Sequence, residues 1–171
     1  MSRAAFLTVL DPPWTRMEPV RLGQVPPGRG TPDRFVVVES DDGPLLRVDL
    51  YRPSDECFAF EEVCLWSGFV VIGWGHQLSM VDLLTRAVLS VDLASYFGHM
   101  YPVEQYLLVA SAESLFRIES DGSVLWRSDA LGIDGVVVDQ VAEGIVRGQG
   151  EWDPPGGWRP FEVNLGTGQR V

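Results

Sequence analysis

The chain has 171 residues, of which 46% are hydrophobic, and 24 acidic against 13 basic side chains give it a formal net charge of -11. This length suffices to bury a substantial core in one domain, residues 1–171, and no run of about 18 apolar residues could span a membrane. The negative charge repels phosphate backbones, which excludes nucleic acid as a partner and favours a protein partner with a basic surface.

The first 33 residues combine one apolar run with an arm rich in proline and glycine. Residues 4–10 are expected to form a strand, and the absence of a small-residue cleavage site after them indicates a mature, cytoplasmic protein. The prolines of the arm are Pro12, Pro13, Pro19, Pro26, Pro27 and Pro32. Because proline cannot donate to a β-ladder, residues 11–33 are predicted to be an irregular arm packed on the rest of the fold.

From residue 34 onward, an apolar triplet followed by an alternating strand recurs four times. The triplets begin at Phe35, Phe69, Tyr106 and Gly144, and the strands that follow them span 45–50, 78–83, 115–120 and 160–165. A nearly fixed period of this kind is typical of stacked supersecondary units. With a further strand before each later triplet, residues 34–171 are predicted to form four β-repeat units, each a four-stranded antiparallel meander. The sequence therefore predicts an all-β, propeller-like array of about four units.

Residues 79–91 give a conflicting signal, because their apolar side chains follow helical spacing behind a capping-box pattern. The alignment of residues 78–83 with three sister strands favours a strand, since the copies of a repeat share one conformation.

When the four strands at 45–50, 78–83, 115–120 and 160–165 are aligned, residues at the same position form a column, and the chemistry of a column predicts its role. The fourth column is apolar and predicts the core face: Val48, Val81, Ile118 and Val163. The fifth column carries acids or an amide just before a turn: Asp49, Asp82, Glu119 and Asn164. Such side chains accept hydrogen bonds from turn amides, and this role is favoured over a ring of ligands.

Residues 115–129 read Leu-Phe-Arg-Ile-Glu-Ser-Asp-Gly-Ser-Val-Leu-Trp-Arg-Ser-Asp. This segment resembles a blade of the quinoprotein-like β-propellers, of the PQQ and WD type, in which a strand and a Gly turn lead into a Leu-Trp strand. The resemblance implies a propeller fold. The copy at residues 84–90 lacks both the turn glycine and the tryptophan, so the quinone of that family is not expected and no cofactor is predicted.

The last unit ends before its fourth strand is complete, which leaves a strand edge. Residues 4–10 either pair beside residues 169–171 and close a small ring, or leave a curved open array. In the second case the same edge could pair with another copy of the chain in a homodimer.

Two further features favour structural roles. Cys57 and Cys64 lie without metal-ligand spacing, which indicates buried, reduced thiols. Residues 96–101, which include His99, form an aromatic cluster between units, and packing between the units is its favoured role.

Loops between the second and third strands of the units should lie on one rim, because equivalent loops of a repeat protein do. These loops are residues 40–44, 74–77, 111–113 and 150–158, the last being the longest. Their candidate binding residues are Trp74, His76, Glu151, Trp152, Asp153 and Trp158. Tryptophan anchors among carboxylates predict a non-enzymatic module that holds a protein partner, as an immunity or inhibitor protein does. The structural alternative is a plug over the end of a small core.

A second function remains open on the same rim. His76 with Asp153 or Glu151 could act as the general base of a hydrolase or lyase, with or without a metal. The sequence contains no GxSxG or HExxH motif that would make such a site specific, so a binding function is favoured over an enzyme.

Overall fold

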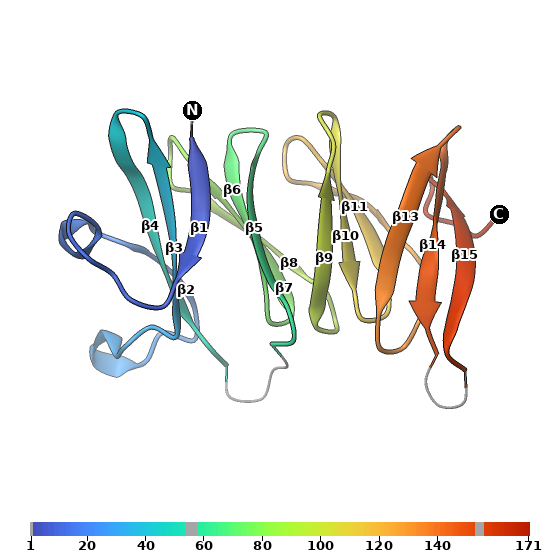
Figure 1. Ribbon diagram of the computed structural model, residues 1–171, viewed down its shortest axis with the longest axis horizontal. Coiled ribbons are helices and arrows are strands. Elements are labelled where there is room, and N and C mark those ends of the chain that lie inside the picture. Colours follow the sequence, from blue (N-terminus) through green and yellow to red (C-terminus); the bar gives the residue numbers. More distant parts are fainter. Residues whose placement is uncertain (1, 54–57, 153–155) are drawn as a thin grey trace.

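The structure is a computed structural model that describes residues 2–53, 58–152 and 156–171, and it is all-β apart from two short 3-10 helices. Four sheets stand side by side in chain order (Figure 1). The first contains β1 (Arg3–Leu7), β2 (Val20–Gly23), β3 (Arg34–Ser40) and β4 (Gly43–Tyr51), and the second β5 (Glu61–Trp66), β6 (Phe69–Trp74), β7 (Gln77–Asp82) and β8 (Val88–Asp92). The third contains β9 (Phe97–Pro102), β10 (Tyr106–Ser111), β11 (Leu115–Glu119) and β12 (Val124–Arg127), and the fourth β13 (Val136–Ala142), β14 (Ile145–Glu151) and β15 (Trp158–Asn164). No helix in these ranges is long and apolar enough to cross a membrane.

The second and third sheets are the four-stranded antiparallel meanders that the repeat predicts, in the orders β5-β6-β7-β8 and β9-β10-β11-β12. The segment with helical spacing, residues 79–91, forms parts of β7 and β8. Strand β7 is buried on both faces from Leu78 to Val81, so its apolar residues do not alternate. This burial explains why the segment resembles a helix in sequence.

The fourth sheet has three strands, and its last strand is only partly covered at the outer edge. Arg170 forms an isolated bridge to Val163, the amide of Asn164 donates to Gln169 O at 2.8 Å, and the amide of Val171 donates to Glu162 O at 3.1 Å. Pro160, further along β15, has no N–H to offer a pairing strand.

The register of the sheets places the repeat columns opposite one another and corrects one boundary. Phe35 pairs with Asp49 and Tyr106 with Glu119, but in the fourth unit Ile145, not Gly144, pairs with Asn164. The fourth triplet therefore begins one residue later than the sequence pattern suggests, because Gly144 lies in the preceding turn with a φ of 75°.

The first sheet is built differently, in the order β1-β3-β4-β2. Strand β1 pairs antiparallel with β3, with Phe6 opposite Val36, and β2 pairs parallel with β4. The N-terminal segment thus supplies both outer positions of this sheet. Of the two alternatives for residues 4–10, the pairing with residues 169–171 does not occur, because β1 fills the place in the first sheet that β5, β9 and β13 fill in the later sheets. The first and fourth sheets lie at opposite ends of the array (Figure 1).

Three hydrophobic cores lie between the four sheets, and the fourth-column residues show how each sheet is turned. Ile118 packs in the core between the second and third sheets, and Val163 packs between the third and fourth. Val48 and Val81 share the core between the first two sheets. Sheets two to four therefore turn this column toward the preceding sheet, whereas the first turns it toward the following one.

The inversion of the first sheet moves one predicted loop off the rim. The β3–β4 turn lies at the upper edge of the array, whereas the β6–β7 and β10–β11 turns lie at the lower edge, where β14 also ends (Figure 1). Residues 40–44 therefore do not share a rim with residues 74–77, because a sheet turned over reverses the direction of its strands.

The Pro- and Gly-rich arm packs on the outer face of the inverted sheet, but residues 11–33 are not irregular throughout, because Val20–Gly23 form β2 and pair with β4. It includes the 3-10 helices η1 (Trp14–Arg16) and η2 (Pro27–Arg29). Arg47 binds both carboxylate oxygens of Asp49, at 2.7 and 2.9 Å, and also donates to the carbonyl oxygens of Trp14 and Met17 at 3.3 and 3.4 Å. This guanidinium therefore fastens the arm to the sheet.

Candidate functional site

The lower edge of the array is held together by backbone hydrogen bonds between successive sheets. The amide of Phe97 donates to Gly75 O at 2.7 Å, and the amide of Leu131 donates to Glu113 O at 2.7 Å. Further along, the amide of Ile133 donates to Glu151 O at 2.7 Å. These bonds fix the turns and connections along the edge, so the side chains that they carry are held in a defined order.

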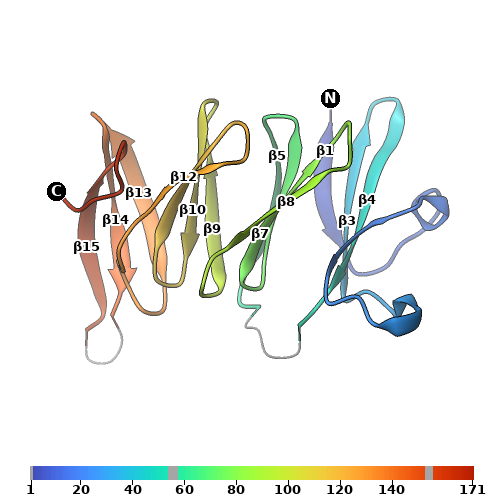
Figure 2. The ribbon, with the colours of Figure 1, turned by 180° about the vertical axis from the view of Figure 1, so that it is seen from behind.

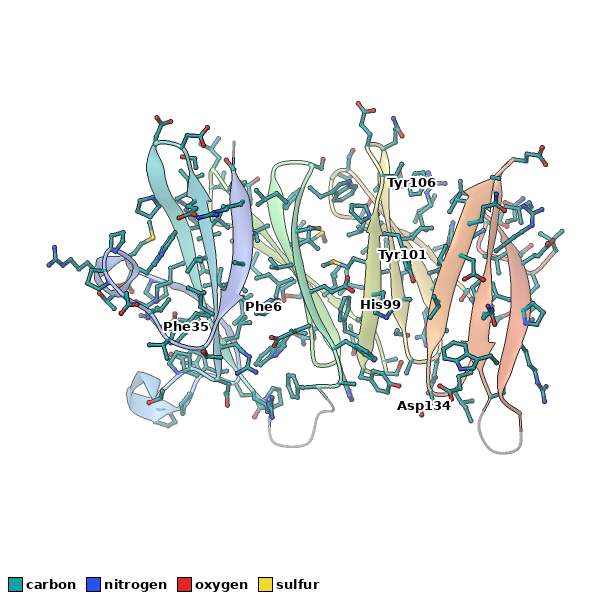
Figure 3. The ribbon with its side chains drawn as sticks, in the orientation of Figure 1. Phe6, Phe35, His99, Tyr101, Tyr106 and Asp134 are labelled. Atoms are coloured by element: carbon teal, nitrogen blue, oxygen red, sulfur yellow. The ribbon has the colours of Figure 1, made fainter. Side chains whose placement is uncertain are left out.

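An aromatic row begins where the second and third sheets meet. The ring of Phe60, just before β5, lies 5.2 Å from the His99 ring and 6.4 Å from the Tyr96 ring. The Tyr96 hydroxyl lies within hydrogen-bonding distance of two Asp134 acceptors, the backbone oxygen and Oδ1, the latter at 2.8 Å. This contact links the aromatic row to the connection that leads into the fourth sheet. Figure 3 shows Asp134 at the lower edge and His99 higher on β9.

The row continues on the fourth sheet. Glu151 and Trp158 are paired in the β14–β15 register, and the amide of Glu151 donates to Gly135 O at 2.8 Å. A Cβ at Gly135 would lie 3.2 Å from the Trp158 ring and 3.6 Å from Glu151 Oε2. The absence of a side chain at Gly135 thus lets the indole and the carboxylate approach the residue next to Asp134. We call this set the aromatic rim: Phe60, Tyr96, Ile133, Asp134, Glu151 and Trp158.

A carboxylate and an imidazole form a pair beside the aromatic rim. Glu62 Oε1 lies 2.7 Å from His99 Nδ1, and Glu62 Oε2 accepts a hydrogen bond from the amide of Met100 at 2.8 Å. Their side chains are about one-third exposed, at 35% for Glu62 and 38% for His99. A carboxylate that orients an imidazole is one component of general-base catalysis. No Ser, Thr or Cys side chain of the described chain forms a hydrogen bond with this imidazole.

Two further groups near this pair have raised pKa values. Burial, followed by the negative charge of Glu62, raises the pKa of the Cys64 thiol to about 11. Burial is also the main cause that raises the pKa of Tyr101, with Glu62 and Asp139 adding to it, although the amide of Val138 donates to the hydroxyl at 3.0 Å. Both groups are therefore protonated at neutral pH and serve the packing between strands. Cys64 is a free thiol, as predicted, but it is only partly buried, whereas Cys57 lies outside the described residues.

The candidate residues that the structure describes lie in two places: Trp74 and His76 are at the β6–β7 turn of the second sheet, and the others are in the fourth sheet or next to it. Trp74 is only 8% exposed and packs in the core between the first two sheets, with its ring 4.5 Å from Phe58. His76 lies at the lower edge, and its backbone oxygen accepts a hydrogen bond from Leu93. Trp74 was predicted as an anchor because it borders the turn, but the alternation of β6 directs it inward.

The long loop of the last unit carries one exposed and one half-buried tryptophan. Trp158 is 49% exposed and pairs with Glu151, while Trp152 is half-buried, with its amide bonded to Gly157 O at 2.9 Å. Asp153 lies outside the described residues. The half-exposed Trp158 lies beside Gly135 on the aromatic rim, whereas a plug would bury it in the core.

The turn that carries His76 borders a cavity without an acidic or basic side chain in its lining. This cavity has a volume of about 250 Å³ and is lined by Leu22, Gly23, Gln24, Leu50, Pro53, Ile72, Trp74, Gln77 and Ser79. None of these side chains is a general acid or base at neutral pH. Among the residues that the structure describes, no group of three or more His, Cys, Asp or Glu side chains is placed to hold a metal ion.

A comparison with known proteins finds no family model and no curated protein that matches this sequence.

Proposed function

We propose that the chain is a non-enzymatic binding module that holds a protein partner on the aromatic rim. The observation that carries this proposal is the exposure of three large apolar side chains along one edge: Phe60 at 45%, Ile133 at 49% and Trp158 at 49%. Apolar groups gathered on a surface are typical of interaction sites, and aromatic side chains are frequent anchors of interfaces.

The charges of the aromatic rim define the class of partner. Asp134 and Glu151 lie among the apolar side chains, and Glu62 lies beside them at His99. Arginine or lysine side chains of a partner can lay their stems on the rings and direct their charges to these carboxylates. The net charge of -11 adds long-range attraction for such a surface. A cationic enzyme or a basic toxin, inhibited by capture, fits this chemistry.

The rim supports binding better than the hydrolase alternative. The lining of the cavity beside the His76 turn includes no acid or base, and Glu151, one of the two carboxylates considered for that reaction, lies against Gly135 and Trp158 in the fourth sheet. Between this sheet and the His76 turn stands the third sheet (Figure 1).

Capture from a native lysate, with matched variants, tests the proposal. The rim variant is Phe60→Ser with Trp158→Ser, and the control is Leu84→Ser, which removes a side chain that is 90% exposed in the turn between β7 and β8. We expect one stoichiometric partner of basic surface to be captured by the wild type and by the control. Loss of two anchors should weaken its binding by at least tenfold, and added salt should weaken it further.

Two outcomes would overturn the proposal. One is a wild-type protein that captures no stoichiometric partner from its native lysate. The other is a partner that the rim variant retains as well as the Leu84→Ser control does.

A further inference from the structure

A second surface feature lies at the far end of the molecule, between the arm and the outer face of the first sheet. It is a pocket of about 330 Å³, and its lining includes Arg16, Glu18, Arg21, Arg47 and Asp49. Three of the 13 basic residues of the chain line it, although the protein as a whole carries a charge of -11. We infer that this pocket binds a phosphate-type oxyanion.

The three guanidinium groups are not equally available. Arg47 is neutralised by the bidentate contact with Asp49, and its third nitrogen serves the carbonyl oxygens of the arm. Arg21 stands opposite Asp49 in the parallel pairing of β2 with β4. Arg16 is exposed and forms no ion pair with any described residue. Arg16 and Arg21 are thus the groups that a ligand could use.

Arg21 carries an unsatisfied donor. Its side chain is 24% exposed, yet its Nε is buried and has no hydrogen-bond acceptor among the described residues. A buried N–H without an acceptor is unfavourable, so a movement of Arg21 that brings this N–H to an oxyanion in the pocket would be favourable. Its Nη2 contacts Glu18 Oε1 at 3.1 Å.

The Glu18 carboxylate contacts Arg21 as the carboxylate or phosphate of a ligand would, but this ion pair is exposed to solvent. The Glu18 side chain is 78% exposed, and it contacts Arg21 through one oxygen, Oε1. Exposed ion pairs of this kind contribute little, so an external anion can displace Glu18 into solvent. Arg16 and Arg21 would then present two uncompensated positive charges. A phosphate group carries roughly -1.5 to -2 at pH 7 and therefore matches them better than a carboxylate does.

Calorimetric titration of the full chain with inorganic phosphate, and separately with acetate, at constant ionic strength tests the inference. We expect saturable binding of phosphate and weaker binding of acetate. Arg21→Gln should weaken phosphate binding about tenfold, since it removes a charged donor. Glu18→Gln should tighten it, because the competing carboxylate is gone. The control is Arg159→Gln, an exposed arginine of the fourth sheet, and it should leave phosphate binding unchanged.

Thermal unfolding without phosphate shows whether Arg21→Gln still folds, and Glu18→Gln tests the pocket without touching an arginine. The inference is overturned if the wild type shows no saturable phosphate binding, if folded Arg21→Gln binds as the wild type does, or if Glu18→Gln weakens binding. Acetate binding as tight as that of phosphate would refute the match to a doubly charged anion.

Discussion

Val48 and Val81 occupy the same column of the repeat, and they pack in the same hydrophobic core. In a uniform stack they would lie in different cores, as Val81 and Ile118 do. The first sheet is therefore turned over with respect to the second, and the apolar faces of these two units meet. The third core lies between the third and fourth sheets, which follow the orientation of the second.

A double-mutant cycle can test whether Val48 and Val81 pack in the same core. Val48→Ala and Val81→Ala should each destabilise the fold by about 1–3 kcal/mol, because both side chains are fully buried. Since the two cavities open in one core, we expect a coupling free energy of at least about 0.5 kcal/mol between them in urea unfolding.

The matched control pairs Val81→Ala with Ile118→Ala. These residues belong to the same column but to different cores, so their effects should add within about 0.5 kcal/mol. Additivity in both pairs would contradict the inverted orientation.

The buried ion pair of the first sheet makes a second prediction. Arg47 and Asp49 are 15% and 4% exposed, whereas Arg147 and Glu162 in the fourth sheet are 38% and 49% exposed. Asp49→Ala leaves a buried guanidinium without its carboxylate and should cost about 3–5 kcal/mol of unfolding free energy. Glu162→Ala should cost less than about 1 kcal/mol. Equal losses in chemical unfolding would argue against this difference in burial.

Asp82 makes a prediction about acid stability. Its Oδ1 accepts hydrogen bonds from the amides of Thr85 and Leu84, at 2.6 and 2.9 Å, and the contacts with Thr85 lower the pKa of the carboxyl below 3.8. A lowered folded-state pKa stabilises the fold above the unfolded value, and this contribution is lost as the pH falls through the folded value. Thermal unfolding from pH 6 to pH 2 should therefore show a loss below pH 3.8.

Asn164 supplies the comparison for Asp82. Its Oδ1 accepts from the amides of Gly166 and Thr167 at 2.9 and 3.1 Å, in the same column, with no titrating group. Asp82→Asn should therefore keep the turn and reduce the acid sensitivity. Asp82→Ala should lower the melting temperature at every pH. If Asp82→Asn lost as much thermal stability below pH 3.8 as the wild type, the loss would come from other carboxyl groups.

The Cys64 thiol makes the fourth prediction. Its pKa is raised from 9.0 to about 11, so the folded protein gains stability from this group below pH 9 and loses it as the pH rises from 9 toward 11. In a Cys57→Ser background, alkylation at pH 8 should be about a hundredfold slower in folded than in unfolded protein, because two pH units reduce the thiolate fraction by that factor. Equal rates would show an accessible, ordinary thiol.

The sequence predicts the strands well because each copy of the repeat supports the others. Residues 79–91 are assigned correctly against their own helical pattern, because residues 78–83 align with the sister strands. The inversion of the first sheet is not visible in the fourth column, since Val48 and Val81 are both valines followed by Asp and Leu. The first sheet differs from the others in long-range contacts that no column predicts, namely the pairing of β1 with β3 across the arm and the parallel pairing of β2 with β4.

The aromatic rim is predicted only in part, for a similar reason. Trp158 and Glu151 are found because an insertion breaks the period there. Phe60 and Tyr96 precede their strands and lie far apart in sequence, and backbone bonds between sheets bring them together. The aromatic cluster at residues 96–101 does indicate this surface, but its side chains point alternately to the core and to the edge. Phe97 is fully buried, while Tyr96 contacts Asp134 at the edge.

The inverted orientation of the first sheet also determines which side chains are exposed on the outer faces at the two ends of the molecule. In Figure 2, seen from behind, the arm lies over the first sheet at one end and β15 closes the other. The outer face of the first sheet carries the Arg47–Asp49 ion pair, and the outer face of the fourth sheet carries the Arg147–Glu162 ion pair. Had all four units faced alike, Val48 and its apolar neighbours would form an outer wall. Instead, the outer faces of both end sheets carry charged side chains of the third column, Arg47 and Glu162, and such faces do not favour head-to-tail stacking of copies.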